Sequence, residues 1–124
     1  MNKVFLDANI LMEILFQRSK YLEISKNMED YSSFYISFLT CHILMYFTEL
    51  EKLDPNNTFK LLENTRILEN IDTTFDLAVK LYDGKDFEDC IQVGTCLENG
   101  IPNFITLDKS LAKKYADKLN IILL

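Results

Sequence analysis

Short apolar runs alternate along the chain with longer segments whose apolar residues recur at helical spacing. Runs without polar alternation are typical of strands that are buried on both faces, as in parallel sheets. Five such runs predict strands at residues 3–6, 34–36, 67–71, 103–107 and 120–124. Because helical segments separate them, the pattern predicts βα units with right-handed crossovers, and therefore an α/β fold with a mostly parallel sheet.

Capping residues predict where the intervening helices begin. Ser, Thr, Asp and Asn are favoured caps, and Pro is favoured at the first helical position. Helices are expected to begin near residues 10 and 20, after Ser37 or Thr40, at Pro55, after Asp72 or Thr73, near Asp86 and at Lys109. The pair Asn99-Gly100 predicts the end of the helix that begins near Asp86.

The composition is that of one ordinary globular domain, which we expect to span residues 1–124. Hydrophobic residues make up 48% of the chain and charged residues 26%, as in typical soluble domains. Asp7 and Glu13 interrupt the apolar stretch at the N-terminus, which is too short for a signal peptide. No run reaches the roughly 18 residues that a membrane span requires. We therefore expect a cytoplasmic protein without a membrane partner.

The cysteines and the single histidine argue against a zinc site. Cys41, Cys90 and Cys96 form no C-x-x-C pair, and His42 is the only histidine. Structural zinc sites gather such ligands at short, regular spacings. We expect the three cysteines to be buried and to pack as small apolar residues in a reducing compartment.

Four aspartates are the candidates for chemistry. Asp7 directly follows the first predicted strand, and Asp108 directly follows the fourth. The carboxyl ends of parallel strands share one edge of the sheet, where ligands of open α/β sheets bind. Asp86 and Asp89 lie near the start of a predicted helix, at a spacing that places both on one face, whereas Glu88 is expected to point elsewhere. Carboxylates that share a site repel one another unless a cation neutralises them, so the pattern indicates a hard divalent metal.

Each of these acids also has a purely structural explanation. Asp7 and Asp108 stand where a helix N-cap is expected, and Asp86 and Asp89 would complement the dipole of their helix. A cap and a metal ligand are not mutually exclusive. Thr106, two residues before Asp108, is a candidate to orient a neighbouring carboxylate by a hydrogen bond.

Two segments carry a resemblance to a known family. They are VFLDANILMEILF at the N-terminus and DFEDCIQVGTCLENGIPNFITLDKSL near the C-terminus. The chain resembles, over nearly its full length, the PIN-domain family, which includes the VapC-type toxin ribonucleases. The resemblance implies a three-layer α/β/α sandwich around a mostly parallel sheet of four to five strands. By position, Asp7, Asp89 and Asp108 match the metal-site acids of the family, Asp86 matches an additional acid, and Asn9 matches a polar position near the first acid.

The chain departs from the family at one acid position. Family members usually carry a Glu three residues after a Ser or Thr that follows the second strand. Here Thr40 is followed at that spacing by Ile43. The adjacent His42 is a possible substitute ligand, and Glu49 and Glu51 are too far along the helix. The resemblance therefore implies a site that lacks one of its usual acids.

The implied function is that of a metal-dependent endoribonuclease that uses Mg²⁺ or Mn²⁺ and leaves a 5′-phosphate and a 3′-hydroxyl. Asp7, Asp89 and Asp108 would bind the metal, and Asp86 would complete the site or position the attacking water. The implied partners are an RNA substrate, a cognate antitoxin protein and a second copy in a homodimer. The formal net charge is −6, so nucleic-acid binding would need metal ions, a local basic patch or a partner.

Three alternatives remain at this point. A haloacid-dehalogenase-like phosphatase also has an acid after its first strand, but it usually has a second Asp where this chain has Asn9. A phosphoacceptor receiver domain has a similar length, but it places an acidic pair near its first strand. The third alternative keeps the PIN-like fold and assigns it a binding or regulatory role with a degenerate, weakly active or inactive site.

Overall fold

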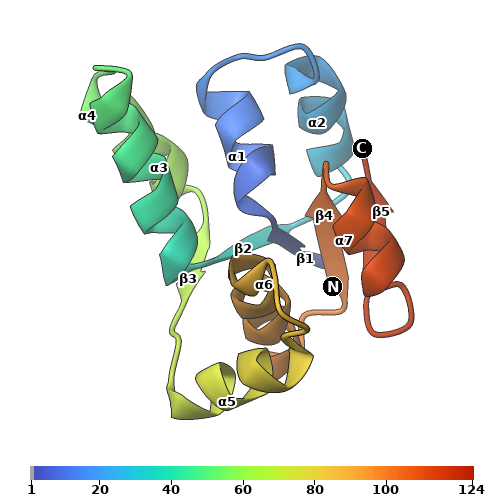
Figure 1. The fold of residues 1–124 in the computed structure, drawn as a ribbon. Coiled ribbons are helices and arrows are strands. Elements are labelled where there is room, and N and C mark those ends of the chain that lie inside the picture. The colour runs from blue at the N-terminus through green and yellow to red at the C-terminus, as the bar shows by residue number, and fades with distance from the viewer. Residues whose placement is uncertain (1) are drawn as a thin grey trace.

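A five-stranded parallel sheet lies at the centre of the computed structural model, which describes residues 2–124 (Figure 1). The strands are β1 (Lys3–Leu6), β2 (Ser33–Ser37), β3 (Arg66–Leu68), β4 (Asn103–Thr106) and β5 (Asn120–Leu123). They are arranged in the order β3-β2-β1-β4-β5, and every neighbouring pair is parallel. The predicted α/β class and the parallel sheet are confirmed.

Helices fill the connections between the strands. They are α1 (Ala8–Leu15), α2 (Tyr21–Met28), α3 (Phe38–Leu50), α4 (Pro55–Glu63), α5 (Asp72–Leu81), α6 (Phe87–Glu98) and α7 (Lys109–Lys114). Ser37 caps α3 by accepting a hydrogen bond from Thr40 N, and Asp54 caps α4, whose first residue is Pro55. The chain leaves α6 through Gly100 at φ +66°, as the Asn99-Gly100 signal predicts.

Both faces of the sheet are buried, which accounts for the apolar runs in the strands. Val4 and Leu6 pack into a core cluster with residues of α1–α4, including Leu11 and Leu44. Between them, Phe5 points to the opposite face and joins a second cluster with residues of α6 and α7. Its ring stacks on that of Phe104 in β4, with ring centroids 5.3 Å apart. α5 packs against α6 on this side, so the molecule has three layers.

The strand order places a topological switch point at the end of β1. From β1 the chain moves to β2 and β3 on one side, and then returns to β4 and β5 on the other. In such sheets, ligands bind at the carboxyl ends of the strands on either side of this reversal. The order also differs from the 2-1-3-4-5 order of receiver domains, so the receiver alternative is wrong.

Several predicted boundaries need correction. The third strand ends at Leu68 instead of Ile71, because the Asn70 side chain donates to Thr95 Oγ1 of α6 and Thr74 Oγ1 accepts from Ile71 N. These contacts turn the segment towards α6, and Ile71, not Asp72 or Thr73, precedes the first helical residue of α5. The fourth strand ends at Thr106. Smaller changes of one or two residues affect the other elements.

The start of α6 requires a second correction. Asp86 lies outside the helix, in the left-handed backbone region at φ +56° and ψ +47°. Helical spacing therefore does not place its side chain, and the shared helical face predicted for Asp86 and Asp89 is wrong.

The cysteines are as predicted, since Cys41, Cys90 and Cys96 are all buried and unpaired. Within residues 2–124, no helix is both long enough and apolar enough to span a bilayer.

Candidate functional site

The carboxylate of Asp7 lies buried at the junction of β1, β4 and α1. Only 6% of the residue is exposed. Its backbone N donates to Ile105 O of β4 at 3.0 Å, which continues the pairing of the two strands. Oδ1 accepts from Ala8 N at 2.8 Å, so Asp7 is also the N-cap of α1. Oδ2 accepts from the Thr106 hydroxyl at 2.7 Å. These contacts hold the carboxylate in one orientation.

Asn9 and Thr106 connect Asp7 to the loop that carries Asp108. Asn9 Nδ2 donates to Asp7 Oδ2 at 3.2 Å, and Asn9 Oδ1 accepts from Leu107 N at 3.3 Å. Thr106 Oγ1 donates to Asp7 and accepts from Asp108 N at 3.0 Å. Asp108 is partly buried and caps α7 by accepting from Leu111 N at 3.1 Å. One hydroxyl group therefore contacts two of the predicted acids.

Asp89 is the third residue of α6 and is partly buried. Burial, as the largest cause, and then the negative charges of Asp7, Asp108, Asp86 and Glu88 together raise its pKa to about 7. Burial also raises the pKa of Asp7 to about 6, against the opposing hydrogen bonds from Thr106 and Ala8 N, with smaller contributions from the charges of Asp108 and Glu88. Asp7, Asp89 and Asp108 are therefore close enough to act on one another, and we call them the acid cluster.

Asp86 and Glu88 lie at the exposed margin of the acid cluster. The charge of Asp86 acts on Asp89, and that of Glu88 acts on both Asp7 and Asp89. Glu88 is exposed, as expected, and its charge nevertheless acts weakly on both acids. Its charge adds to the repulsion within the acid cluster.

No Lys, Arg or His of the described residues forms an ion pair with the acid cluster. Within residues 2–124 the only ion pair joins Lys114 to Asp83. Carboxylate oxygens that repel one another without a counter-charge suit a hard divalent cation. However, no three His, Cys, Asp or Glu side chains of the described residues are arranged as a ready metal-binding group. The donor chemistry thus fits a divalent metal, and the structure shows interacting acids without a preformed coordination shell.

Comparisons with known proteins assign the family. The family model described as "PIN domain" matches residues 4–117. The chain belongs to the PIN domain family. This membership sets aside the phosphatase and receiver alternatives. No curated protein sequence matches the chain significantly.

Solved structures share the fold of this PIN domain at low sequence identity. A chain of a toxin–antitoxin complex from Klebsiella pneumoniae is 19% identical, with a TM-score of 0.77 over 96% of this chain and 95% of that one. A chain of VapBC2 from Rickettsia felis, crystallised with a promoter DNA fragment, is 16% identical, with a TM-score of 0.69 over 98% and 97%. A protein from Pyrobaculum aerophilum is 21% identical, with a TM-score of 0.58 over 91% and 86%.

His42 lies apart from the acid cluster. It is exposed on α3 and lines a groove of about 590 Å³ with Phe38, Ile67 of β3 and Ile91 of α6. It is not among the groups that shift the pKa of Asp7 or Asp89. The structure therefore does not bring this possible substitute ligand together with the acids. Ile43, where the family usually has Glu, is partly buried but joins neither core cluster.

A buried polar bridge beside the site was missed from the sequence. Gln92 of α6 is only 1% exposed; its Oε1 accepts from Ser37 Oγ at 2.7 Å and its Nε2 donates to Thr40 Oγ1 at 2.9 Å. This bridge fixes α6, one turn beyond Asp89, against the start of α3. A signal was present, because Gln92 stands four residues before the buried Cys96 and therefore on the same helical face.

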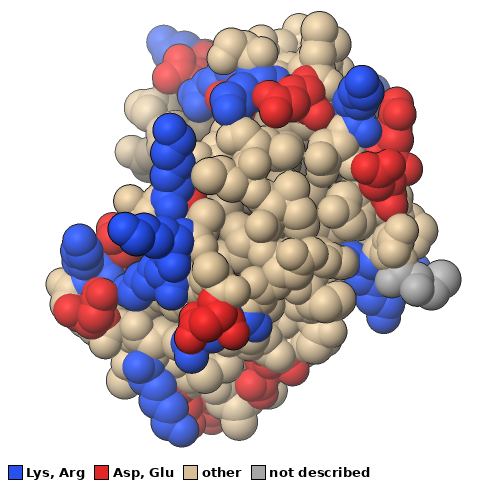
Figure 2. Space-filling view, turned by 90° about the vertical axis from the view of Figure 1, so that its right-hand side faces the viewer, with Lys and Arg blue, Asp and Glu red and all other residues tan. Residues whose placement is uncertain are grey.

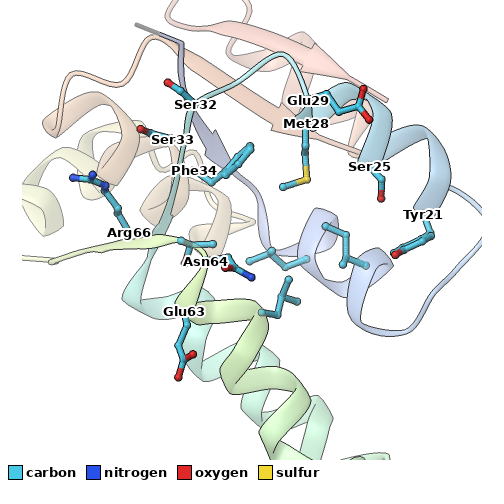
Figure 3. Close-up of a pocket in the computed structure, with 14 residues that line it drawn as sticks. Tyr21, Ser25, Met28, Glu29, Ser32, Ser33, Phe34, Glu63, Asn64 and Arg66 are labelled. Carbon is cyan, nitrogen blue, oxygen red and sulfur yellow. The ribbon is translucent and has the colours of Figure 1, made fainter.

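One large hollow of the molecule does not contain the acid cluster. It has a volume of about 680 Å³ and lies between α1, α2, α4 and the first residues of β2 and β3, at the opposite edge of the sheet. Figure 3 shows Met28 and Phe34 pointing into it and Arg66 pointing away. A smaller pocket of about 250 Å³ includes Asp86 and Asp89 and extends to α7. Only this second pocket adjoins the acids.

The raised pKa values predict an unusual pH dependence of stability in metal-free protein. Between about pH 4 and about pH 7 the folded chain holds more protons on Asp7 and Asp89 than the unfolded chain, so the free energy of unfolding falls as pH rises. For Asp7, a pKa of about 6 in the folded chain in place of 3.8 in the unfolded chain lowers the free energy of unfolding at pH 7 by about 3 kcal/mol relative to acidic pH. Urea denaturation in EDTA at pH 5, 6, 7 and 8 measures the decrease.

The Asp89→Asn variant is the matched control for that measurement. It removes the charge, and no hydrogen bond contributes to the pKa shift of Asp89. The variant is expected to be more stable than the wild type at pH 8 and to lose less stability between pH 6 and pH 8. Parallel pH profiles for the two proteins would contradict the electrostatic description of the acid cluster.

Proposed function

We propose that this protein is a divalent-metal-dependent endoribonuclease and the toxin of a toxin–antitoxin pair. The observation that carries the proposal is the convergence of Asp7, Asp89 and Asp108 at the switch point of the sheet, where the pKa values of Asp7 and Asp89 are raised and, within residues 2–124, none of the three acids forms an ion pair. Membership of the PIN family and the likeness to chains of toxin–antitoxin complexes support it.

Each residue of the site would have a separate role in the proposed reaction. Asp7, Asp89 and Asp108 would hold Mg²⁺ or Mn²⁺, and the metal would neutralise phosphate charge and lower the pKa of a water. Thr106 and Asn9 keep the Asp7 carboxylate oriented through their hydrogen bonds. Asp86, at the exposed margin, completes the site or positions the attacking water. Water adds to phosphorus, the bond to the 3′-oxygen breaks and that oxygen takes a proton, which leaves a 5′-phosphate and a 3′-hydroxyl.

Asp89 is the acid whose protonation would respond most strongly to a bound cation. Its pKa of about 7 in the metal-free protein leaves it partly protonated near neutral pH. A cation beside it would lower that pKa and release the proton, so that the ionised carboxylate could bind the metal.

The second candidate function is a PIN-like binding or regulatory module. Ile43 in place of the family Glu favours it, together with the separate location of His42. In that case the acid cluster is a remnant with weak or no turnover. Metal binding and RNA cleavage decide between the two candidates.

The first prediction concerns metal binding, followed by melting temperature at pH 7.5. At a hundred times the Kd, Mn²⁺ is expected to add about 2.7 kcal/mol to the free energy of unfolding. Asp89→Asn should abolish the increase, whereas Asp76→Asn, which changes an exposed acid on α5, should retain it. If the wild type shows no increase but Ile43→Glu does, the site is degenerate and the second candidate function holds.

The second prediction concerns catalysis. With Mn²⁺ the purified protein is expected to cleave single-stranded or structured RNA, and gel analysis of end-labelled substrate will reveal the 5′-phosphate products. Asp7→Asn or Asp89→Asn should reduce the rate by more than about 100-fold, and Thr106→Val by about 10- to 100-fold, because outer contacts tune metal ligands by that amount. Cleavage by Asp89→Asn at the wild-type rate would indicate a contaminant and contradict the assignment.

The third prediction concerns partners. Phe75 and Val79 on α5 are 58% and 49% exposed, and exposed apolar patches mark interaction surfaces. We infer a homodimer, which light scattering will test, and an antitoxin with a basic segment that complements the net charge of −6.

Expression in a bacterial host should arrest growth, and co-expression of the product of the adjacent gene should restore it. Growth arrest by Asp89→Asn to the same extent would contradict a toxic nuclease activity.

A further inference from the structure

The small pocket beside the acid cluster has basic as well as acidic walls. One wall is formed by the loop between α5 and α6 and by the first turn of α6, the other by α7. The residues that concern us are Lys85, Asp86 and Asp89 on the first wall and Ser110, Lys114 and Tyr115 on the second. The sequence alone does not mark Lys85, Ser110 or Lys114 as functional residues. The structure places all three beside two of the site acids.

Backbone conformation sets the position of Lys85. It stands between Gly84 at φ +109° and Asp86 at φ +56°, so both of its chain neighbours have positive φ. A non-glycine residue in that region is uncommon and costs free energy. The loop thereby brings Lys85 to the pocket next to the residues that begin α6.

Lys114 is held on the other side of the pocket. Its Nζ lies 2.8 Å from Asp83 Oδ2 and 5.4 Å from the centroid of the Tyr115 ring. The ion pair joins residues 31 positions apart and is the only one within residues 2–124. The side chains of Lys114 and Asp83 are 36% and 50% exposed, and ion pairs this exposed add little to stability. Stability alone does not explain the pair.

The surroundings are locally basic although the chain is acidic. α7 and the turn that follows it carry Lys109, Lys113, Lys114 and Lys118. Figure 2 shows the face on which α7 and β5 lie, with Lys and Arg side chains along one side, interspersed with Asp and Glu, and a middle nearly free of charge. The lysines of this segment are exposed and therefore available to a polyanion that approaches from this side. Nucleic-acid backbones are bound by such residues through their phosphates.

We propose that Lys85, Lys114 and the Ser110 hydroxyl bind a backbone phosphate of the RNA strand, next to the phosphate that is cleaved at the acid cluster. Asp83 holds Lys114 beside the pocket in the free protein, and the bound phosphate replaces Asp83 as its partner. This subsite sets the path of the strand from α7 towards Asp89. It rests on the proposed ribonuclease function and specifies how that function engages its substrate.

The experiment measures binding of a fluorescein-labelled single-stranded RNA oligonucleotide to the full chain by anisotropy, in EDTA so that no cleavage occurs. Lys85→Ala and Lys114→Ala should each weaken binding and reduce the slope of log K against log salt by about 0.7, the value for one phosphate contact on a single strand. Asp83→Asn should strengthen binding, because it frees Lys114. Lys60→Ala, which removes an exposed lysine of α4 outside the pocket, should behave as the wild type.

Two further measurements separate the outcomes. Under Mn²⁺, Lys114→Ala should raise KM and leave kcat unchanged, which indicates lost binding rather than lost chemistry. Inorganic phosphate, added to the RNA-binding assay, tests whether the pocket is instead a site for free phosphate. If phosphate competes with RNA in the wild type but the lysine variants bind RNA with wild-type affinity, the subsite does not bind the RNA backbone and the proposal fails. Wild-type salt slopes for Lys85→Ala and Lys114→Ala, with RNA still bound and cleaved, would overturn the subsite and leave the ribonuclease intact. A wild-type protein that neither binds nor cleaves RNA would overturn both.

Discussion

The hydrogen bond between the Thr106 hydroxyl and the Asp7 carboxylate joins the two central strands at the point where each of them ends. Parallel pairing of β1 with β4 brings the two residues together, and the order of the sheet makes this edge the switch point. The hydroxyl also accepts from Asp108 N. Loss of this group would remove one of the three hydrogen bonds that hold the Asp7 carboxylate and would leave Asn9 as the side chain that connects Asp7 to the Asp108 loop, so the geometry of the acids depends strongly on a side chain that bears no charge.

The acid cluster stores unfavourable electrostatic free energy in the fold. Burial and mutual repulsion both oppose ionisation of Asp7 and Asp89, and the apolar clusters on the two faces of the sheet must offset that cost. Active sites are commonly less stable than the rest of a protein for this reason. In the proposed metal-dependent function, this destabilising charge would also be the feature that attracts a cation, so function and instability would have the same origin.

Hydrophobic periodicity and the residues at strand ends were enough to predict the sheet and the acids at its edge. The buried strands β1 and β4 are apolar on both faces, so they and the acids that follow them were recognisable. β3 is an edge strand with a half-exposed Ile67, and its weak pattern led to a strand that was too long. The left-handed turn at Asp86 and the pocket between Lys85 and Lys114 depend on tertiary contacts, which no local pattern contains.

The distance along the chain between the partners of the central hydrogen bond has a consequence for biosynthesis. Asp7 and Thr106 are 99 residues apart, and domains are translated from the N-terminus at about 5–20 residues per second. β1 therefore leaves the ribosome several seconds before β4, and during that time Asp7 has neither Thr106 nor Asp108 beside it. A nascent chain cannot assemble the acid cluster. If the chain is the ribonuclease proposed above, it can cleave RNA only after the last βα unit has folded.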